Sequence, residues 1–316
     1  MIGSHMIATV TLNPAVDKSV TVRGFEMGKT NRGEVDRVDA GGKGINVAKV
    51  LKRLGAAVCA LGLEAGSNGR FILDALSAEG IPSDFVHVPG ETRVNLKIHD
   101  LERGTETELN EPGFHVSPEH LEELRQKIAA YAPQCEVMVF SGSLPPGAPP
   151  EVFADLMGIA TARGAKCILD TAGPALKLGL AAGPFLIKPN RAELEELLQR
   201  RLSSRRDLVE GARELIRMGS EQVLISLGAE GAVGVAGDDA LFARPPAVKV
   251  RSSVGAGDTM VAVMAYAALA KLSFREAFQM AVAASAATVA MEGTRVADLA
   301  AVQALIPQVI LESCAP

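Results

Sequence analysis

Short apolar runs alternate along the chain with longer segments in which apolar residues recur every three or four positions. Runs of the first kind are typical of buried strands, and the second spacing is typical of helices with one apolar face. The predicted strands are residues 7–12, 58–63, 137–140, 167–169, 185–188 and 222–226. The predicted helices are residues 45–54, 69–79, 121–131, 150–163, 191–199, 208–218, 258–271 and 274–288. This alternation predicts an α/β fold, with a parallel sheet that helices cover on both faces.

Two stretches, residues 19–39 and 84–112, break this pattern because they are richer in alternating and turn-forming residues. Within the second stretch, residues 94–99 and 105–109 flank a turn at Gly104, which predicts a β-hairpin. We therefore expect the two stretches to form a small separate sheet at the rim of the main one.

The composition narrows the class of protein. The 316 residues are 48% hydrophobic and 22% charged, which is ordinary globular usage and excludes a disordered or fibrous chain. The formal net charge of −5 argues against a nucleic-acid partner, because general nucleic-acid binders need a basic excess. No apolar run reaches the roughly 18 residues of a membrane span, so no membrane partner is expected.

The cysteines and the N-terminus bear on where the protein works. Cys59, Cys135, Cys167 and Cys314 are far apart and lack the spacing of a metal or redox motif. They predict reduced thiols and hence a cytoplasmic protein. Residues 1–5 resemble an expression-vector scar, so we expect the natural chain to start at Met6.

The strongest candidate for chemistry is the loop at residues 254–259, Val-Gly-Ala-Gly-Asp-Thr, which enters a long predicted helix. Its glycines let backbone N–H groups approach a ligand, and the helix start adds partial positive charge. Gly255, Ala256 and Gly257 therefore predict an anion hole. Asp258 beside them suits a base that takes the proton of an attacking hydroxyl. The structural alternative is an aspartate that only caps the helix.

Residues 40–46, Ala-Gly-Gly-Lys-Gly-Ile-Asn, form a second glycine-rich entry to a helix. A Walker A loop needs Ser or Thr where this chain has Gly44, and the third glycine of G-x-G-x-x-G would fall on Val47. A P-loop NTPase and a dinucleotide enzyme are therefore disfavoured. Asn46 suits hydrogen bonds to sugar hydroxyls; the alternative is a helix start with packing glycines.

Three further loops each have a functional and a structural interpretation. Asp17 follows the first strand and suits a grip on two hydroxyls, or is a turn residue beside a proline. Asn190 and Glu193 suit a water-mediated Mg²⁺ site, or form a capping box. Residues 226–231 suit nucleotide phosphates, or form a hairpin turn.

Two cations, Arg93 and Lys29, lie in the expected small sheet and suit an anionic substrate. The loop at residues 141–147 lacks the G-x-S-x-G of a nucleophile elbow, so no hydrolase serine is predicted there.

Together these residues resemble the ribokinase-like (PfkB) sugar kinases, and among them the hexose-phosphate kinases. Residues 41–47 are similar to the family's first signature and residues 254–258 to its second, and the likeness runs from residue 11 to residue 295. Residues 92–95 and 110–113 are similar to the 1-phosphofructokinase and tagatose-6-phosphate kinase group, whereas residues 284–288 and 293–295 also resemble the minor bacterial 6-phosphofructokinase. The resemblance implies one three-layer α/β/α domain over residues 6–316, with a mostly parallel central sheet and the small sheet as a lid.

The resemblance also implies roles for particular residues. Asp258 matches the catalytic base, and Gly255, Ala256 and Gly257 match the anion hole. The implied substrate contacts are Asp17, Lys29, Gly41, Gly42, Lys43, Asn46, Arg93, Asn95 and Ser143. The implied ATP contacts are Lys188, Asn190, Ser226, Gly228 and Gly231, with Asn190 and Glu193 placing Mg²⁺ through water. A monovalent cation is implied near Ser252, Val254, Met291, Gly293 and Arg295.

The implied function is ATP-dependent phosphorylation of a ketohexose monophosphate, with fructose 1-phosphate converted to fructose 1,6-bisphosphate as the preferred reaction. Tagatose 6-phosphate and fructose 6-phosphate are the alternative substrates. A non-catalytic sugar-phosphate sensor and a kinase for an unphosphorylated sugar or nucleoside are the alternative functions. The family also implies a homodimer formed through the lid.

Overall fold

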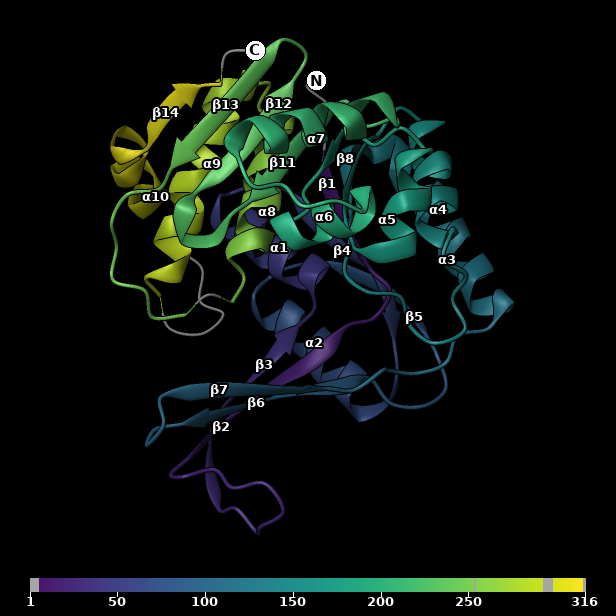
Figure 1. Ribbon diagram of the computed structural model, residues 1–316. Helices are drawn as coiled ribbons and strands as arrows, with labels where there is room; N and C mark the ends of the chain where they lie inside the picture. Colours follow the sequence, from purple (N-terminus) through teal and green to yellow (C-terminus); the bar gives the residue numbers. More distant parts are fainter. Residues whose placement is uncertain (1–5, 253, 292–297, 315–316) are drawn as a thin grey trace.

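The computed structural model describes residues 6–252, 254–291 and 298–314 (Figure 1). Its largest element is a ten-stranded sheet. From edge to edge the strands are β14 (Ile310–Ser313), β13 (Asp239–Arg244), β12 (Ala232–Ala236), β11 (Gln222–Ser226), β10 (Leu186–Ile187), β9 (Lys166–Asp170), β8 (Cys135–Ser141), β1 (Met6–Thr11), β4 (Val58–Glu64) and β5 (Ser83–His87). Neighbours from β11 to β5 run parallel, which confirms the predicted parallel sheet.

One edge of this sheet is antiparallel, which agrees with the mostly parallel sheet that the resemblance implies. Strands β11, β12, β13 and β14 pair antiparallel to one another. Strands β12 and β13 follow β11 without an intervening α-helix, so the alternation of strand and α-helix that identifies the rest of the sheet is missing here.

Helices cover both faces of the sheet, as predicted. The helices on one face are α3 (Pro118–Tyr131), α4 (Val152–Thr161), α5 (Gly173–Leu180), α6 (Arg191–Leu198) and α7 (Arg205–Arg217). Those on the other face are α1 (Lys43–Arg53), α2 (Gly66–Ala78), α8 (Ala256–Leu269), α9 (Phe274–Val289) and α10 (Leu299–Leu305). Successive strand residues alternate between the two cores: Val137 and Val139 of β8 face one, Met138 and Phe140 the other. The α/β/α architecture is therefore confirmed.

A second, four-stranded sheet projects from the main body, at the bottom of Figure 1. Its strands are, in order, β3 (Gly33–Gly41), β2 (Ala15–Val22), β6 (Arg93–Asp100) and β7 (Thr105–Asn110). Strands β6 and β7 form the predicted hairpin. The prediction that residues 84–112 all belong to this sheet is wrong at its start, because β5 pairs with β4 in the main sheet and buries Val86 there.

The small sheet has one polar and one apolar face, because successive strand residues point to opposite sides. Asp17 of β2 pairs with Asn95 of β6, so these two residues share a face with Arg93 and Lys97. The opposite face carries the cross-strand pairs Val20–Ile98 and Leu96–Leu109. No helix among the described residues is long and apolar enough to cross a bilayer.

Candidate functional site

Helix α8 begins at the predicted anion hole, with Asp258 in its first turn. Gly255, just before the helix, has φ 78°, a left-handed conformation that residues with a side chain adopt at a cost. The hydroxyl of Thr259 donates to the Gly255 carbonyl at 2.9 Å and lies 3.1 Å from the Thr288 hydroxyl of α9. Helix α9 therefore helps to fix the turn that carries Asp258.

Asp258 is only 8% exposed, and its Oδ2 accepts a hydrogen bond of 2.7 Å from Asn46 Nδ2. This bond joins the two glycine-rich entries, because Asn46 lies on α1 and Asp258 on α8. Burial, followed by the charge of Asp170, raises the pKa of Asp258 to about 6, against the Asn46 hydrogen bond and the charges of Lys43 and Lys188. A carboxylate with such a pKa is ionised at neutral pH and is a stronger base than an exposed aspartate.

Two lysines lie near Asp258 and share a buried carboxylate, Asp170. The Oδ1 atom of Asp170, at the end of β9, lies 3.3 Å from Lys43 Nζ and 3.5 Å from Lys188 Nζ. Lys188 also approaches the anion hole, since a Cβ added to Gly257 would lie 3.2 Å from its Nζ. The sequence analysis finds both lysines but misses Asp170, which carries no motif; its position after a buried strand is the only signal.

A second group of predicted residues lies where the small sheet meets the main body. Asn95 Nδ2 donates to Asp17 Oδ1 at 3.0 Å, and Lys97 Nζ lies 3.8 Å from Asp17 Oδ2. A Cβ on Gly41 would come within 2.7 Å of the Asp17 carboxylate, so the glycine leaves that carboxylate its space. Lys97 is missed by the sequence analysis, although its spacing of two from Asn95 places it on the same face of β6.

Arg93, at the start of β6, donates hydrogen bonds to residues of the main body and to a residue beside the small sheet. Its Nη2 donates to the Asn13 carbonyl at 3.2 Å and to Ser143 Oγ at 3.4 Å, and its Nη1 donates to the Glu111 carbonyl at 3.2 Å. Burial lowers the pKa of Arg93, and the charge of Asp17 opposes this shift. The guanidinium is therefore a fixed cation beside Asp17 and Ser143.

Unpartnered polar atoms gather around these two groups. Buried polar atoms in proteins are nearly always hydrogen-bonded, so a cluster of exceptions indicates a place where a ligand or water supplies the partner. Side-chain atoms without a hydrogen bond in the described part of the chain include Thr11 Oγ1, Asn13 Oδ1, Asn46 Oδ1, Arg93 Nε, Asn95 Oδ1, Ser141 Oγ and Asp170 Oδ2.

A cavity of about 460 Å³ adjoins Lys43. Its wall includes Gly142 and Ser143 after β8, Thr171 after β9 and Glu193 on α6. Burial lowers the pKa of Lys43, but the charges of Asp170, Asp258 and Glu193 outweigh it and leave the pKa raised. The cavity therefore keeps a cation on its wall.

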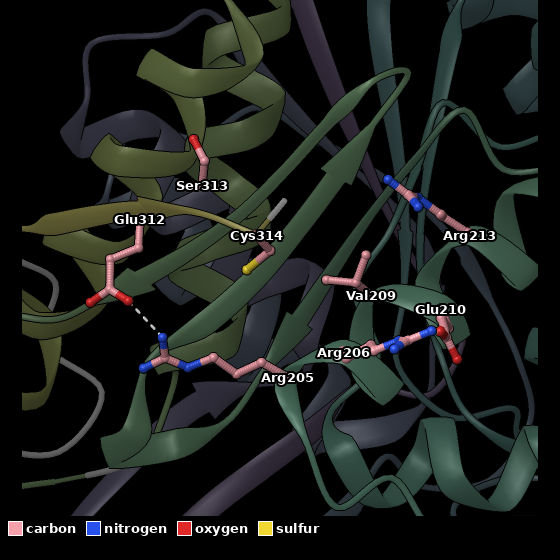
Figure 2. Close-up of a pocket in the computed structure, with 8 residues that line it drawn as sticks. All are labelled: Arg205, Arg206, Val209, Glu210, Arg213, Glu312, Ser313 and Cys314. Atoms are coloured by element: carbon pink, nitrogen blue, oxygen red, sulfur yellow. Dashed lines mark hydrogen bonds and ion pairs between the residues drawn. The ribbon is translucent and has the colours of Figure 1, made fainter. Parts of the chain in front are cut away.

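Another cavity, of about 380 Å³, lies between α7 and β14 and contains none of the predicted site residues (Figure 2). Arg205 pairs with Glu312 and Arg206 with Glu210, so the guanidinium groups largely satisfy the carboxylates beside them (Figure 2).

The residues predicted for ATP and Mg²⁺ adopt the structural alternatives. Asn190 caps α6: its Oδ1 accepts from the Glu193 N–H at 2.9 Å, and Glu193 Oε2 accepts from the Asn190 N–H at 2.8 Å. Residues 226–231 form the turn between β11 and β12, with Gly228 at φ 60° and Gly231 at φ 115°. Asn190 and Ser226 are bridged side by side, so the two loops adjoin.

Lys29 is not near the other cation of the predicted phosphate site. Strand β2 pairs with β6 from Ala15 beside Arg93 to Val22 beside Asp100, and Lys29 follows Val22 in the exposed loop before β3. Seven residues of strand separate the two ends, or about 23 Å. Within one chain, Lys29 therefore does not lie beside Arg93, although both are expected to contact the substrate.

Of the positions implied for a monovalent cation, Gly293 and Arg295 lie outside the described residues. Among those described, Ser252 Oγ accepts from the Val254 N–H at 3.2 Å.

Comparison with known proteins gives a consistent set of relatives. A profile of the pfkB family of carbohydrate kinases matches residues 7–300. A 1-phosphofructokinase of Rhodobacter capsulatus is 42% identical over 280 residues, 88% of this chain and 89% of that protein. A 1-phosphofructokinase of Escherichia coli is 38% identical over 309 residues, 98% of this chain and 99% of that protein.

Among solved structures, phosphofructokinase-2 of Escherichia coli in complex with potassium is similar over 96% of this chain and 99% of that one. Its TM-score is 0.90 and its sequence is 32% identical. The likeness therefore covers both the main body and the small sheet.

Proposed function

We propose, since this chain belongs to the pfkB family of carbohydrate kinases, that it transfers the γ-phosphoryl group of ATP to fructose 1-phosphate and yields fructose 1,6-bisphosphate. The single observation that carries the chemistry is Asp258, a buried carboxylate in the first turn of α8, hydrogen-bonded to Asn46 and close to two lysines. The two relatives named 1-phosphofructokinase support the choice of sugar.

In this proposal Asp258 takes the proton of the attacking hydroxyl. The amides of Gly255, Ala256 and Gly257 stabilise the negative charge that develops on the transferring group, because they lie at the positive end of α8. Asn46, expected at a sugar hydroxyl, donates a hydrogen bond from Nδ2 to Asp258 and keeps Oδ1 for a ligand.

On the nucleotide side, Lys188 supplies positive charge for phosphates, and the adjoining loops of Asn190, Ser226, Gly228 and Gly231 border the same end of the sheet. Lys43, expected at the substrate, lies beside Lys188 on the shared carboxylate of Asp170. No group of three or more His, Cys, Asp or Glu in the described ranges would hold a metal unaided. A Mg²⁺ ion bound with the phosphates of ATP would keep waters, and Asn190 and Glu193 would contact it through them. Bound there, it neutralises phosphate charge.

On the sugar side, Asp17 and Asn95 supply a carboxylate and an amide for hydroxyl groups, with Gly41 and Gly42 leaving room beside them. Arg93 and Ser143 form the site for the phosphate that the sugar already carries, because the guanidinium is fixed and its charge is permanent.

A substrate panel tests this proposal. The readout is the release of ADP. We expect kcat/KM to be highest for fructose 1-phosphate, lower for tagatose 6-phosphate and fructose 6-phosphate, and lowest for free fructose. Equal values for fructose and its phosphates would contradict the proposal. If the protein releases no ADP from ATP with any ketohexose phosphate, the chain is a sensor and the proposal fails.

The apolar face of the small sheet supports a dimer through the lid. Val35, Val38 and Leu109 are exposed on it, and Met27 and Leu101 are exposed in the flanking loops. Exposed apolar patches of this kind mark interaction surfaces, and a second copy of the same sheet would cover them. Since Lys29 cannot reach Arg93 in its own chain, its role at the sugar phosphate requires that it come from the partner's lid.

We expect Leu109→Glu to convert the dimer to monomers, because it places a charge on a strand that is exposed along its whole length. Leu109→Glu should also raise the KM for fructose 1-phosphate. Lys29→Ala should raise the same KM while the dimer stays intact. Sedimentation velocity and steady-state kinetics measure the two effects. Ile310→Glu, at an exposed position on β14 (52% against 64% for Leu109), is the control that leaves the dimer intact. A wild-type monomer, or a Leu109→Glu dimer, would contradict the lid interface.

The potassium bound to the Escherichia coli structure supports a monovalent cation requirement, which a comparison of rates in potassium and tetramethylammonium salts would test.

A further inference from the structure

Asp170 is a buried carboxylate that the roles assigned above leave unused. It ends β9, is 1% exposed, and directs Oδ1 at two ammonium groups while Oδ2 has no hydrogen bond. The two ammonium groups come from different loops: Lys43 follows the glycines at the start of α1, and Lys188 follows β10.

Two cations share one oxygen of a buried carboxylate, and they differ in their contact with solvent. Lys188 is 6% exposed, whereas the side chain of Lys43 is 39% exposed and lines the 460 Å³ cavity. Each ammonium has three donors, so both keep donors for an anion after their contact with Asp170. Burial raises the pKa of Asp170, but the charges of Lys188 and Lys43 outweigh it, so the pKa is lowered and the carboxylate stays ionised.

The shared oxygen also limits how far apart the two Nζ atoms can lie. Both distances end on Oδ1, so the separation of the ammonium groups cannot exceed about 7 Å. One phosphoryl group fits between two ammonium groups at such a separation, with a charge-assisted contact of about 2.8 Å on each side.

We propose that Asp170 is a positioning residue for phosphoryl transfer, which holds the ammonium groups of Lys43 and Lys188 beside the anion hole of α8 so that both contact the transferring group. The inference rests on the proposed kinase function. It assigns Asp170 no contact with the substrate, because it acts through the two lysines.

The arrangement has an electrostatic consequence at Asp258. The charged groups that act on Asp258 are Asp170, which raises its pKa, and Lys43 and Lys188, which lower it. Removing the charge of Asp170 leaves the two cations unopposed, so the acid limb of the kcat profile should move to lower pH. Removing the charge of Lys43 should move the limb to higher pH.

The test compares Asp170→Asn and Lys43→Met with the wild type. We expect Asp170→Asn to lower kcat by about 10²-fold, the scale of losing an oriented contact to the transferring group, with a small change in the KM for fructose 1-phosphate. The acid limbs of the two variants should shift in opposite directions. The control is Asp84→Asn, which removes the carboxylate that pairs with Lys127. This variant should change neither kcat nor the pH of the acid limb.

A mutant cycle distinguishes positioning from other roles. If Asp170 acts through the lysines, adding Asp170→Asn to the Lys43→Met, Lys188→Met double variant should change kcat less than threefold. The proposal would be overturned if Asp170→Asn lowered kcat in the double variant by the same factor as in the wild type. It would also be overturned if the only defect of Asp170→Asn were a higher Mg²⁺ concentration for half-maximal activity. If Asp170→Asn does not fold, the acid limb of the kcat profile of Lys43→Met still tests the proposal. An acid limb at the same pH as in the wild type would overturn the proposal. A wild type inactive on every ketohexose phosphate contradicts the kinase function instead.

Discussion

Asp258→Asn is expected to lower kcat for fructose 1-phosphate by about 10²–10⁴-fold, the usual contribution of a general base. Asparagine has nearly the same shape and keeps an oxygen for the Asn46 donor, but it cannot take the hydroxyl proton. The dissociation constants of ATP and fructose 1-phosphate, measured by calorimetry, should change little. The loss should therefore lie in kcat rather than in KM.

Folding of this variant is checked by its melting temperature. Burial and Asp170 disfavour the ionised form of Asp258 in the folded protein, so its pKa lies above that of the unfolded chain. A carboxyl group of this kind lowers stability once the pH exceeds its unfolded pKa, and the neutral amide removes that effect. Asp258→Asn should consequently melt no lower than the wild type at pH 7. The control is Asp207→Asn, an aspartate in the first turn of α7, which should keep full activity. Near-normal kcat in Asp258→Asn would refute the assigned base.

Arg93→Ala is expected to lower kcat/KM for fructose 1-phosphate by about 10²–10³-fold, the scale of removing one partner of a desolvated charge pair. Its guanidinium is held by the carbonyls of Asn13 and Glu111, so in the wild type the cation is in place before the substrate arrives. The low rate with free fructose should not fall, because that sugar has no phosphate to contact Arg93. The selectivity between the two sugars should therefore fall by the same factor.

The control is Arg125→Ala, which removes an arginine from helix α3 of the main body. Arg125 lies 3.5 Å from Glu122 and 3.4 Å from Asp155, outside the predicted site and the small sheet, and its loss should affect neither sugar's kinetics. If Arg93→Ala weakened fructose and fructose 1-phosphate equally, Arg93 would have a structural role and the phosphate site would lie elsewhere.

Much of the site is predictable because the carboxyl ends of parallel strands lie together along one end of the sheet. Asp17, Asn46, Lys188 and Asp258 are separated widely in sequence, yet each follows a strand or lies near the start of a helix at that end. The glycines beside them leave room for a ligand to approach the backbone, so the sequence alone predicts where the proposed anion hole and the proposed sugar side lie.

What the sequence does not indicate depends on side-chain geometry and on which strand ends lie together. Asp170 follows a strand without any motif, and its importance lies in the two lysines that reach it from other loops. Lys29 has the right charge, but β2 carries it to the opposite end of the small sheet from Arg93. Residues 84–87 alternate like the small sheet, yet burial of Val86 places them in the main one.

The pH dependence of kcat at saturating ATP and fructose 1-phosphate tests most directly whether Asp258 is the base. Phosphate esters themselves titrate near pH 6, so saturation and a parallel profile of Asp258→Asn are needed to separate the enzyme's limb from the substrate's. The account predicts that wild-type kcat falls about tenfold per pH unit along an acid limb between pH 8 and pH 5, since burial and the charge of Asp170 raise the pKa of Asp258 above its ordinary value. The residual rate of Asp258→Asn should lack this limb. A wild-type profile that is flat from pH 5 to pH 8, or the same limb in both proteins, would contradict it.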